Sequence, residues 1–205
     1  RLRRDDGVLP KRPLITSGCS GGLTFYDFAA TTEPLTSTRT VSPQQVYDAM
    51  ARLLVHASEF YRTVGGFHSS ALSDGDNLLV IAHDIGRHNT LDKIAGACLA
   101  CHIPAADQLL VTTGRISTEM LIKAVRLQVP FVLSRNSPTL LAVRLARAWN
   151  VTLIGYVRGR GMHVYAGQSR VVTAESAQNE ERRVERAAWG SARCNFATFG
   201  SSLSW

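Results

Sequence analysis

Between residues 77 and 157 the chain alternates short apolar runs with longer segments in which apolar residues recur every three or four positions. The short runs predict buried strands, and the longer segments predict amphipathic helices. The predicted strands span residues 77–83, 108–113, 130–133 and 151–157, and the helices between them span residues 90–100, 117–127 and 137–149. Because strands that are apolar on both faces need cover on both sides, we expect a three-layer α/β/α sandwich.

An earlier amphipathic helix is predicted over residues 43–58. Ser42 is a typical N-cap residue, Pro43 suits the first helical position, and Gln45 stands where a capping box places a glutamine. Apolar residues at helical spacing form the expected buried face, namely Val46, Met50, Leu53 and Leu54. The later helix over residues 137–149 is expected to bury Leu141, Leu145 and Ala148.

Two short runs, residues 67–71 and 78–82, flank a polar turn at residues 73–76. This arrangement predicts an antiparallel hairpin. We expect the hairpin to join the sheet formed by the later strands and to make that sheet mixed. In such sheets, ligands bind outside the carboxyl ends of the strands.

The chain of 205 residues is long enough for one domain with its own core, and 45% of its residues are hydrophobic. It contains no run of eighteen apolar residues, so we expect no membrane span. It opens at Arg1 without the features of a secretory signal, and its four cysteines do not form the pattern of a disulfide framework. We therefore expect a cytoplasmic protein.

The formal net charge is +7, and arginine supplies nearly all of the basic excess, since lysine occurs only at Lys11, Lys93 and Lys123. The planar guanidinium group matches phosphate and carboxylate oxygens, which favours a phosphate-bearing partner. A phosphorylated cofactor, an acidic protein surface or a solvated basic face would each account for this composition. Nucleic acid is a weaker alternative, because the aromatic residues do not interleave with the arginines.

One cysteine, Cys19, stands in a loop of glycines and serines between an apolar run and an aromatic one. Glycines let such a loop approach another molecule closely, and a reactive thiol needs solvent access. A structural thiol would instead lie in an apolar periodic segment. Because no acid or base stands nearby in the sequence, a reactive thiol and an ordinary glycine-rich turn both remain open from this stretch alone.

Three polar clusters follow predicted strands, at residues 84–89, 113–117 and 158–161. The rule for strand ends places them at one edge of the sheet. In the first cluster, Arg87 beside a helix N-terminus would form an anion site, with His83 and His88 close by. The alternative is that Asn89 caps the helix and Asp84 pairs with Arg87.

The last cluster alternates arginine and glycine from Arg158 to Gly161. Glycines at alternate positions would let the backbone turn against a ligand while two guanidinium groups reach phosphate oxygens. A simple glycine-rich turn with exposed arginines is the alternative. The functional interpretation gains support because three such clusters are expected at the same edge.

Cys98, Cys101 and His102 have the spacing of a c-type haem attachment site, and two cysteines so spaced also occur in redox and zinc sites. They stand at the end of an apolar helix, where small buried thiols are common, and zinc would need two further ligands. We favour core packing and expect no metal, with haem or zinc as alternatives.

A zinc deaminase is excluded, because its His-x-Glu and Pro-Cys-x-x-Cys segments are missing.

Several ordered stretches of the chain together resemble one known family. They are SGCSG (17–21), FHSSA (67–71), HDIGRHNTLDK (83–93), GRISTEM (114–120) and GYVRGRG (155–161), the last continuing through Val164 and Tyr165. Over residues 14–167 the chain is similar to the formate dehydrogenase accessory sulfurtransferase family, FdhD/NarQ. The resemblance implies a cytidine-deaminase-like α/β/α core that forms a homodimer.

The resemblance also implies a chemistry, that of a sulfurtransferase with a cysteine persulfide intermediate. Such a protein accepts sulfur from a cysteine desulfurase and passes it to the molybdenum cofactor of formate dehydrogenase. The persulfide position falls on Cys19, and the cofactor's bis-molybdopterin guanine dinucleotide form would bind the loop at residues 156–161. The expected cofactor-binding residues are Tyr156, Val157, Arg158, Gly159, Arg160 and Gly161 from this loop, with Arg87, His88 and Arg115 from the other clusters.

The chain departs from the family pattern in three ways. Gly22 stands where many members carry the second cysteine of a Cys-x-x-Cys loop. Either Cys19 alone carries the sulfur, or the second thiol is dispensable, or the protein has lost efficient transfer. A non-catalytic chaperone for the cofactor is the alternative function that the missing cysteine favours. Residues 1–167 are expected to form the FdhD-like domain without the family's N-terminal domain, and residues 168–205 to form a C-terminal extension of unknown role.

Overall fold

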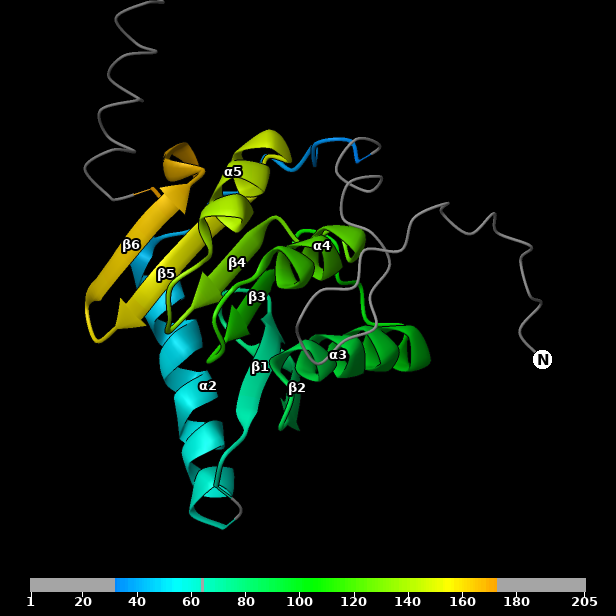
Figure 1. Cartoon of the computed structure of the whole chain (residues 1–205), viewed down its shortest axis with the longest axis vertical. Coiled ribbons are helices and arrows are strands. Elements are labelled where there is room, and N and C mark those ends of the chain that lie inside the picture. The colour runs from blue at the N-terminus through cyan, green and yellow to red at the C-terminus, as the bar shows by residue number, and fades with distance from the viewer. Residues whose placement is uncertain (1–31, 64, 173–205) are drawn as a thin grey trace, which may run out of the picture.

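The computed structural model describes residues 32–63 and 65–172. In this part of the chain, six strands form one sheet in the order β2-β1-β3-β4-β5-β6 (Figure 1). The strands are β1 (His68–Ser73), β2 (Leu78–Asp84), β3 (Leu109–Thr112), β4 (Phe131–Ser134), β5 (Thr152–Arg158) and β6 (Gly161–Ala166). β1 pairs antiparallel with β2 and β3, the pairs β3–β4 and β4–β5 are parallel, and β6 is antiparallel to β5. The predicted mixed sheet is therefore confirmed.

Helices cover both faces of this sheet (Figure 1). They are α2 (Pro43–Thr63), α3 (Arg87–Cys101), α4 (Thr118–Arg126) and α5 (Leu140–Ala148), followed by the short 3₁₀ helix η1 (Gln168–Arg170). Along β4, Phe131 and Leu133 pack in the core beneath α2, while Val132 packs in the core beneath α3, α4 and α5. This alternation on a strand buried on both faces confirms the predicted α/β/α sandwich.

The start of α2 has the predicted capping box. Ser42 Oγ accepts a hydrogen bond from the Gln45 main-chain N–H, and Gln45 Oε1 accepts one from the Ser42 N–H, both at 3.1 Å. The helix runs past the predicted end at residue 58 as far as Thr63. It is followed by Gly65 and Gly66, whose φ angles of 66° and 63° suit a chain leaving a helix.

The early hairpin also forms as predicted. In its turn, the Asp74 carboxylate accepts hydrogen bonds from the main-chain N–H groups of Asp76 and Asn77, at 2.9 and 2.6 Å. An aspartate that bonds its own backbone in this way stabilises a tight turn. The hairpin makes β2 one edge of the sheet.

The start of α3 differs from the prediction. The helix begins at Arg87, with Gly86 as its N-cap and no side-chain cap, so Asn89 lies inside the first turn and does not cap the helix. The side chain of Asp84 takes that role in part, because Asp84 Oδ1 accepts hydrogen bonds from the Gly86 N–H at 2.9 Å and from Asn89 Nδ2 at 3.0 Å. The predicted Asn89 cap is therefore wrong.

Two further predictions need correction. Helix α5 begins at Leu140 after a Thr139 cap and buries Ala142, Val143 and Ala146, whereas Leu141, which was predicted to be buried, is 51% exposed. Ala148, also predicted to be buried, is exposed. Two alanines and Val143, rather than Leu141, therefore lie against the sheet. Strand β6 was not predicted, because it lies at the edge of the sheet and is only partly buried. It pairs with β5, so residues 158–161 form the turn of a β-hairpin. Beyond β6, Val171 bridges to Val41 ahead of α2.

Candidate functional site

The C-terminal ends of β2, β3, β4 and β5 lie at one edge of the sheet, because β2 and β3 are both antiparallel to β1 and β3–β5 are parallel. The three predicted clusters therefore share this edge. Three strands separate β2 from β5, which places the outer clusters about 19 Å apart at a spacing of about 4.8 Å per strand. A ligand that reaches both must be elongated.

The loop after β4 connects the clusters, and it was missed in the sequence. Asn136 Nδ2 donates to the carbonyl of Thr113 at 2.7 Å, and the Asn136 carbonyl accepts from the Tyr156 N–H at 3.4 Å. The Arg135 carbonyl accepts a hydrogen bond from Arg158 Nε at 3.3 Å. The rule for strand ends could have found this loop, because the polar pair Arg135 and Asn136 directly follows a predicted strand.

The loop at residues 156–161 begins with an unusual backbone. Tyr156 has a φ of 52° inside an irregular stretch of β5, a conformation that is uncommon for residues other than glycine and is enriched at functional sites. The Arg158 guanidinium lies 5.5 Å from the centre of the Tyr156 ring, and the His163 ring meets that ring edge-on, also at 5.5 Å. The aromatic and basic side chains of this loop therefore form one exposed cluster.

The other predicted residues of this loop differ in exposure. Arg160 and Gly161 are exposed in the turn, and Gly159 has a φ of 55° that favours glycine. The Val157 side chain is only 1% exposed, because it packs in the core beneath α2. A ligand on this loop would therefore meet the side chains of Arg158 and Arg160, and only the main chain of Val157.

Arg87 and Arg115 lie near Gly114, at the part of the sheet edge where β2 and β3 end. A Cβ atom on Gly114 would lie 3.0 Å from Arg87 Cβ and 3.5 Å from His68 Nδ1, so the loop packs closely against both side chains. Burial, with further contributions from the charges of Arg87 and Arg115, lowers the pKa of His68. Arg87 Nε is buried and has no hydrogen-bond partner in the described part of the chain. This cationic group is chemically suited to an anion.

His88 is directed toward helix α4. Its Nε2 lies 3.3 Å from Glu119 Oε2, and its buried Nδ1 has no partner among the residues described. Burial lowers the pKa of His88, although the Glu119 carboxylate opposes that shift. His88 thus joins α3 to α4 at this end of the sheet.

The alternative in which Asp84 pairs with Arg87 does not hold, because Asp84 pairs with Lys93 at 2.7 Å. The hydrogen bond from Lys93, together with those from the Gly86 N–H and Asn89, lowers the pKa of Asp84 to about 2. Arg87 therefore keeps its charge available to a ligand, which favours the anion site over the alternative.

The cysteines fall into two groups. Cys19 lies outside the described residues, so its predicted role stays a prediction. Cys98 is buried in the core, as expected, whereas Cys101 is exposed, and core packing does not describe it. Burial, with a smaller effect from Cys101, raises the pKa of Cys98.

In residues 32–63 and 65–172, no three histidine, cysteine or carboxylate side chains form a group that could hold a metal ion.

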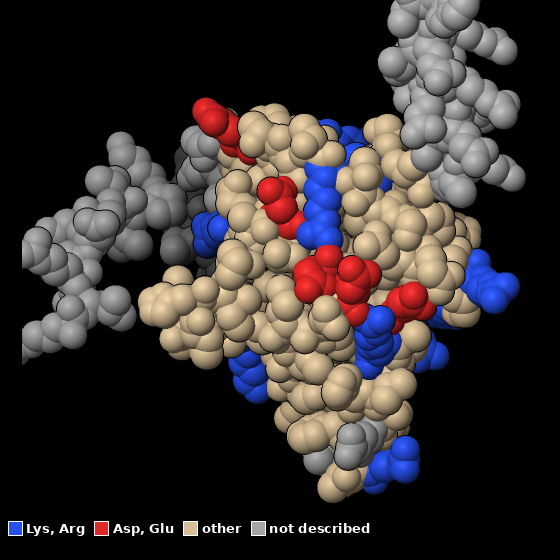
Figure 2. Space-filling view, turned by 180° about the vertical axis from the view of Figure 1, so that it is seen from behind, with Lys and Arg blue, Asp and Glu red and all other residues tan. Residues whose placement is uncertain are grey.

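Charge is mixed on the face of the molecule seen from behind. Figure 2 shows acidic side chains next to basic ones among the described residues of this face, without one continuous basic surface. None of the described helices is both long and apolar enough to cross a membrane.

The fold and the edge together define an α/β/α domain with arginine-bearing loops at the carboxyl ends of its strands. The chain belongs to the FdhD/NarQ family, whose model matches residues 3–172. The sequence-based assignment to this family is therefore confirmed.

Individual relatives agree with this assignment. Two proteins named sulfur carrier protein FdhD, from Staphylococcus aureus strains MRSA252 and Newman, are 42% and 41% identical over 164 residues, which is 79% of this chain and 62% of theirs. A crystal structure of a candidate formate dehydrogenase accessory protein from Desulfotalea psychrophila has 26% identity and a TM-score of 0.65, covering 72% of this chain and 61% of that one. The chain thus spans about 62% of the length of the curated relatives it matches.

Proposed function

We propose that this protein is a sulfur carrier that accepts persulfide sulfur from a cysteine desulfurase and transfers it to the molybdenum cofactor of formate dehydrogenase. The observation that carries the proposal is the 42% identity, across 79% of the chain, to proteins named sulfur carriers. The name of the structural relative, an accessory protein of formate dehydrogenase, supports the choice of client enzyme. We place the exchange in the cytoplasm and expect the protein to act as a homodimer.

The covalent step uses Cys19. The Cys19 thiolate attacks the terminal sulfur of the desulfurase persulfide, so that a new S–S bond forms at Cys19 and the desulfurase cysteine leaves as a thiolate. The sulfur atom is exchanged between thiols, and no outside oxidant is required. A positive charge close to Cys19 would favour its thiolate form.

The client cofactor would dock through its nucleotide phosphates. In its bis-molybdopterin guanine dinucleotide form, the molybdenum cofactor is elongated and carries phosphates, which suits clusters spread along one edge of the sheet. Arg158 and Arg160 are exposed at one end, while Arg87, with its buried unpartnered Nε, and Arg115 lie at the other. Guanidinium groups bind phosphate through paired hydrogen bonds.

Mass spectrometry after incubation with a cysteine desulfurase and cysteine tests the covalent step. We expect one added sulfur atom on the peptide that contains Cys19, and no such addition in Cys19→Ala. If Cys19→Ala gains the sulfur on the peptide of another cysteine, the assignment of the carrier residue is wrong.

A non-catalytic chaperone for the cofactor is the second candidate, and Gly22 favours it because a second loop cysteine is missing there. Such a protein would bind the guanine dinucleotide cofactor and deliver it without forming a persulfide. The two candidates differ in Cys19→Ala. A chaperone keeps both nucleotide binding and maturation of formate dehydrogenase in this variant, whereas a sulfur carrier keeps only nucleotide binding.

A further inference from the structure

Three buried hydroxyl side chains stand side by side at the arginine-bearing edge of the sheet, where β1 begins and β3 and β4 end. Ser70 is paired with Thr112 across β1 and β3, and Thr112 is paired with Ser134 across β3 and β4. All three residues are 0% exposed. Leu110 and Val132, two positions earlier on β3 and β4, pack in the core beneath α3, α4 and α5. The hydroxyl row therefore lies on this same face of the sheet.

One end of the hydroxyl row is bonded to the first turn of α3. Ser70 Oγ lies 2.7 Å from Thr90 Oγ1 and 2.8 Å from Thr112 Oγ1, within hydrogen-bond distance of both. Thr90 is also 0% exposed, and its Oγ1 donates to the carbonyl of Arg87 at 2.7 Å. Because Arg87 carries the buried Nε that has no partner in the described part of the chain, the row holds the main chain of a residue suited to an anion.

The middle of the row holds the loop after β3. Thr112 Oγ1 accepts a hydrogen bond from the Gly114 N–H at 3.1 Å, and Ser134 Oγ donates one to the Gly114 carbonyl at 2.6 Å. Both main-chain polar groups of Gly114 are thus bonded to the row. Arg115 follows directly, so the position of its main chain depends on these two hydroxyls.

The far end of the row holds the loop after β4. Ser134 Oγ accepts a hydrogen bond from the Asn136 N–H at 2.9 Å. Asn136 bonds in turn to the Thr113 carbonyl through Nδ2 and to the Tyr156 N–H through its own carbonyl. One connected set of hydrogen bonds therefore runs from the first turn of α3 to the loop at residues 156–161.

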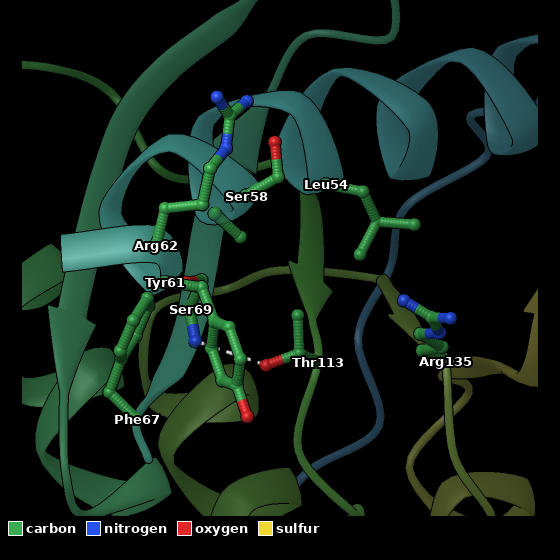
Figure 3. A pocket seen from close by; sticks show the side chains of 9 residues that line it. Leu54, Ser58, Tyr61, Arg62, Phe67, Ser69, Thr113 and Arg135 are labelled. Atoms are coloured by element: carbon green, nitrogen blue, oxygen red, sulfur yellow. Dashed lines mark hydrogen bonds between the residues drawn. The ribbon is translucent and has the colours of Figure 1, made fainter. Parts of the chain in front are cut away.

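The residues next to the row bond the strand ends on the α2 side of the sheet. The Ser69 N–H donates to Thr113 Oγ1 at 3.0 Å, as drawn in Figure 3, and the Thr113 N–H donates to the Ser69 carbonyl at 2.9 Å. Both residues line a cavity of about 530 Å³ beside the C-terminal half of α2, and Tyr61, Arg62 and Arg135 also line it. The strand ends are therefore fixed by hydroxyl groups on both faces.

Core packing does not explain why hydroxyls occupy these positions. In β3 and β4 the three residues before Thr112 and Ser134 are all apolar. A buried hydroxyl that lacks a partner costs about 1–3 kcal/mol, whereas valine or alanine would fill the same space without a polar group. The bonds that satisfy the row end on the main chain of the three polar clusters. The placement of the hydroxyls thus follows the site and not the core.

We propose that Ser70, Thr112 and Ser134 are positioning residues of the candidate site, which hold Arg87, the loop at Gly114 and the loop after β4 at a fixed mutual spacing. The proposal rests on the proposed function, because it requires a phosphate-bearing ligand at this edge. It goes beyond that function by giving a role to buried residues that the ligand does not touch. A ligand that contacts the edge then meets groups already in place, which reduces the cost of ordering them.

Substitutions of Thr112 test the role of the hydroxyl. Thr112→Val keeps the size of the side chain and removes the hydroxyl, whereas Thr112→Ser keeps the hydroxyl and removes the methyl group. In calorimetric titrations of the full chain with GDP, we expect Thr112→Val to bind about threefold or more weakly, as the loss of one hydrogen bond implies. Thr112→Ser should bind as the unaltered protein does. Ser134→Ala is a second, smaller change that should weaken binding in the same way.

Thr152→Val is the matched control. Thr152 is also a 0% exposed threonine, but it begins β5 at the opposite edge of the sheet, where its hydroxyl donates to the Gly167 carbonyl at 3.4 Å. This variant loses a buried hydrogen bond as Thr112→Val does. We expect it to bind GDP normally, because it leaves the hydroxyl row intact.

Amide hydrogen exchange distinguishes a connected row from separate local bonds. Ser70→Ala removes the hydroxyl at one end and leaves the partners of the Gly114 and Asn136 N–H groups in place. Measured by NMR on the full chain without ligand, both N–H groups should exchange at least about threefold faster than in the unaltered protein, after correction for the change at Val132 in the middle of β4. If each hydroxyl acts only on the group that it bonds, both corrected rates stay unchanged.

The outcomes separate this proposal from the proposed function. The positioning role is wrong if Thr112→Val binds GDP as tightly as Thr112→Ser, if Thr152→Val loses as much affinity, or if Ser70→Ala leaves both corrected rates unchanged. The sulfur-carrier function would stand in each case, because persulfide formation at Cys19 is measured independently by mass spectrometry. Failure of the unaltered chain to bind GDP would overturn both the positioning role and nucleotide docking, again without affecting the persulfide result.

Discussion

Arg158 donates a hydrogen bond from Nε to the main-chain carbonyl of Arg135 at 3.3 Å. The bond joins the β5–β6 hairpin to the loop after β4, two segments that the sequence separates by more than twenty positions. It holds the stem of Arg158, and among the described residues no hydrogen bond occupies its terminal N–H groups, which could therefore meet a ligand. The position of this guanidinium is therefore set before a ligand arrives.

Replacing Arg158 should weaken nucleotide binding. We expect Arg158→Ala to bind GDP roughly tenfold or more weakly, because a hydrogen bond to a charged group contributes about 1.5–3 kcal/mol. Calorimetric titration measures the change. Arg144→Ala, an exposed arginine of α5 away from the edge, is the matched control. Equal losses in the two variants would mean that only net charge matters.

Gly155→Ala should destabilise the fold. The added Cβ would lie 2.9 Å from Tyr165 Cε2 and 3.0 Å from the Asn136 carbonyl, so the loop after β4 must shift. We expect the free energy of unfolding in urea to fall by about 1–3 kcal/mol, as in other overpacked positions. Gly96→Ala, in α3 with open space around it, should instead raise that free energy by roughly 0.5–1 kcal/mol. A neutral Gly155→Ala would contradict the close packing.

Tyr156 should be strained in its main chain. A left-handed conformation costs a non-glycine residue roughly 1–2 kcal/mol, and Tyr156 has a φ of 52°. We therefore expect Tyr156→Gly to have a free energy of unfolding about 1 kcal/mol higher than that of Tyr156→Ala, since both lose the ring and only glycine relieves the strain. Equal stabilities of the two variants, measured in urea, would show that this strain is absent.

Asp84 should make stability depend on pH in the acid range. Hydrogen bonding, first from Lys93, lowers its pKa from 3.8 to about 2 in the folded protein. Its stabilisation is therefore complete above pH 3.8 and is lost as the pH falls from 3.8 toward 2. We expect the Tm of Asp84→Asn to vary less with pH over this window than the Tm of the unaltered protein. Identical Tm profiles in acid would contradict the assigned shift.

The two cysteines of α3 should respond differently to substitution. Cys98→Ser places a hydroxyl in the core and should lower the free energy of unfolding by about 1–3 kcal/mol. Cys101→Ser changes an exposed side chain and should stay within about 0.5 kcal/mol. Both variants should still accept sulfur at Cys19. A visible haem spectrum or bound zinc that is lost in Cys101→Ser would instead revive the metal-site alternative.

The layered fold could be predicted because hydrophobic period and local capping agree with each other. Ser42 and Gln45 form the expected capping box, and the wholly apolar run at Phe131 is a strand buried on both faces. The errors arose where tertiary contacts decide. Asp84, rather than Asn89, bonds the start of α3, and Ala142, Val143 and Ala146, rather than Leu141, lie against the sheet.

Only part of the candidate site could be predicted from the sequence. The arginines at positions 87, 115, 158 and 160 stand in recognisable glycine-bearing stretches, so the strand-end rule brought them to one edge. Tyr61 and Arg62 could not be found in this way, because they follow the predicted end of α2 and line a cavity formed by segments far apart in the chain. The left-handed conformation of Tyr156 likewise depends on the packing of its neighbours.

Among the described helices, α2 alone packs on one face of the sheet, against β1 to β5, whereas three helices share the other face. Detachment of α2 would expose the apolar residues of several strands at once, so this helix and the sheet should melt together in a single cooperative transition. Amide hydrogen exchange along α2 and through the strands beneath it should therefore report one common free energy of opening.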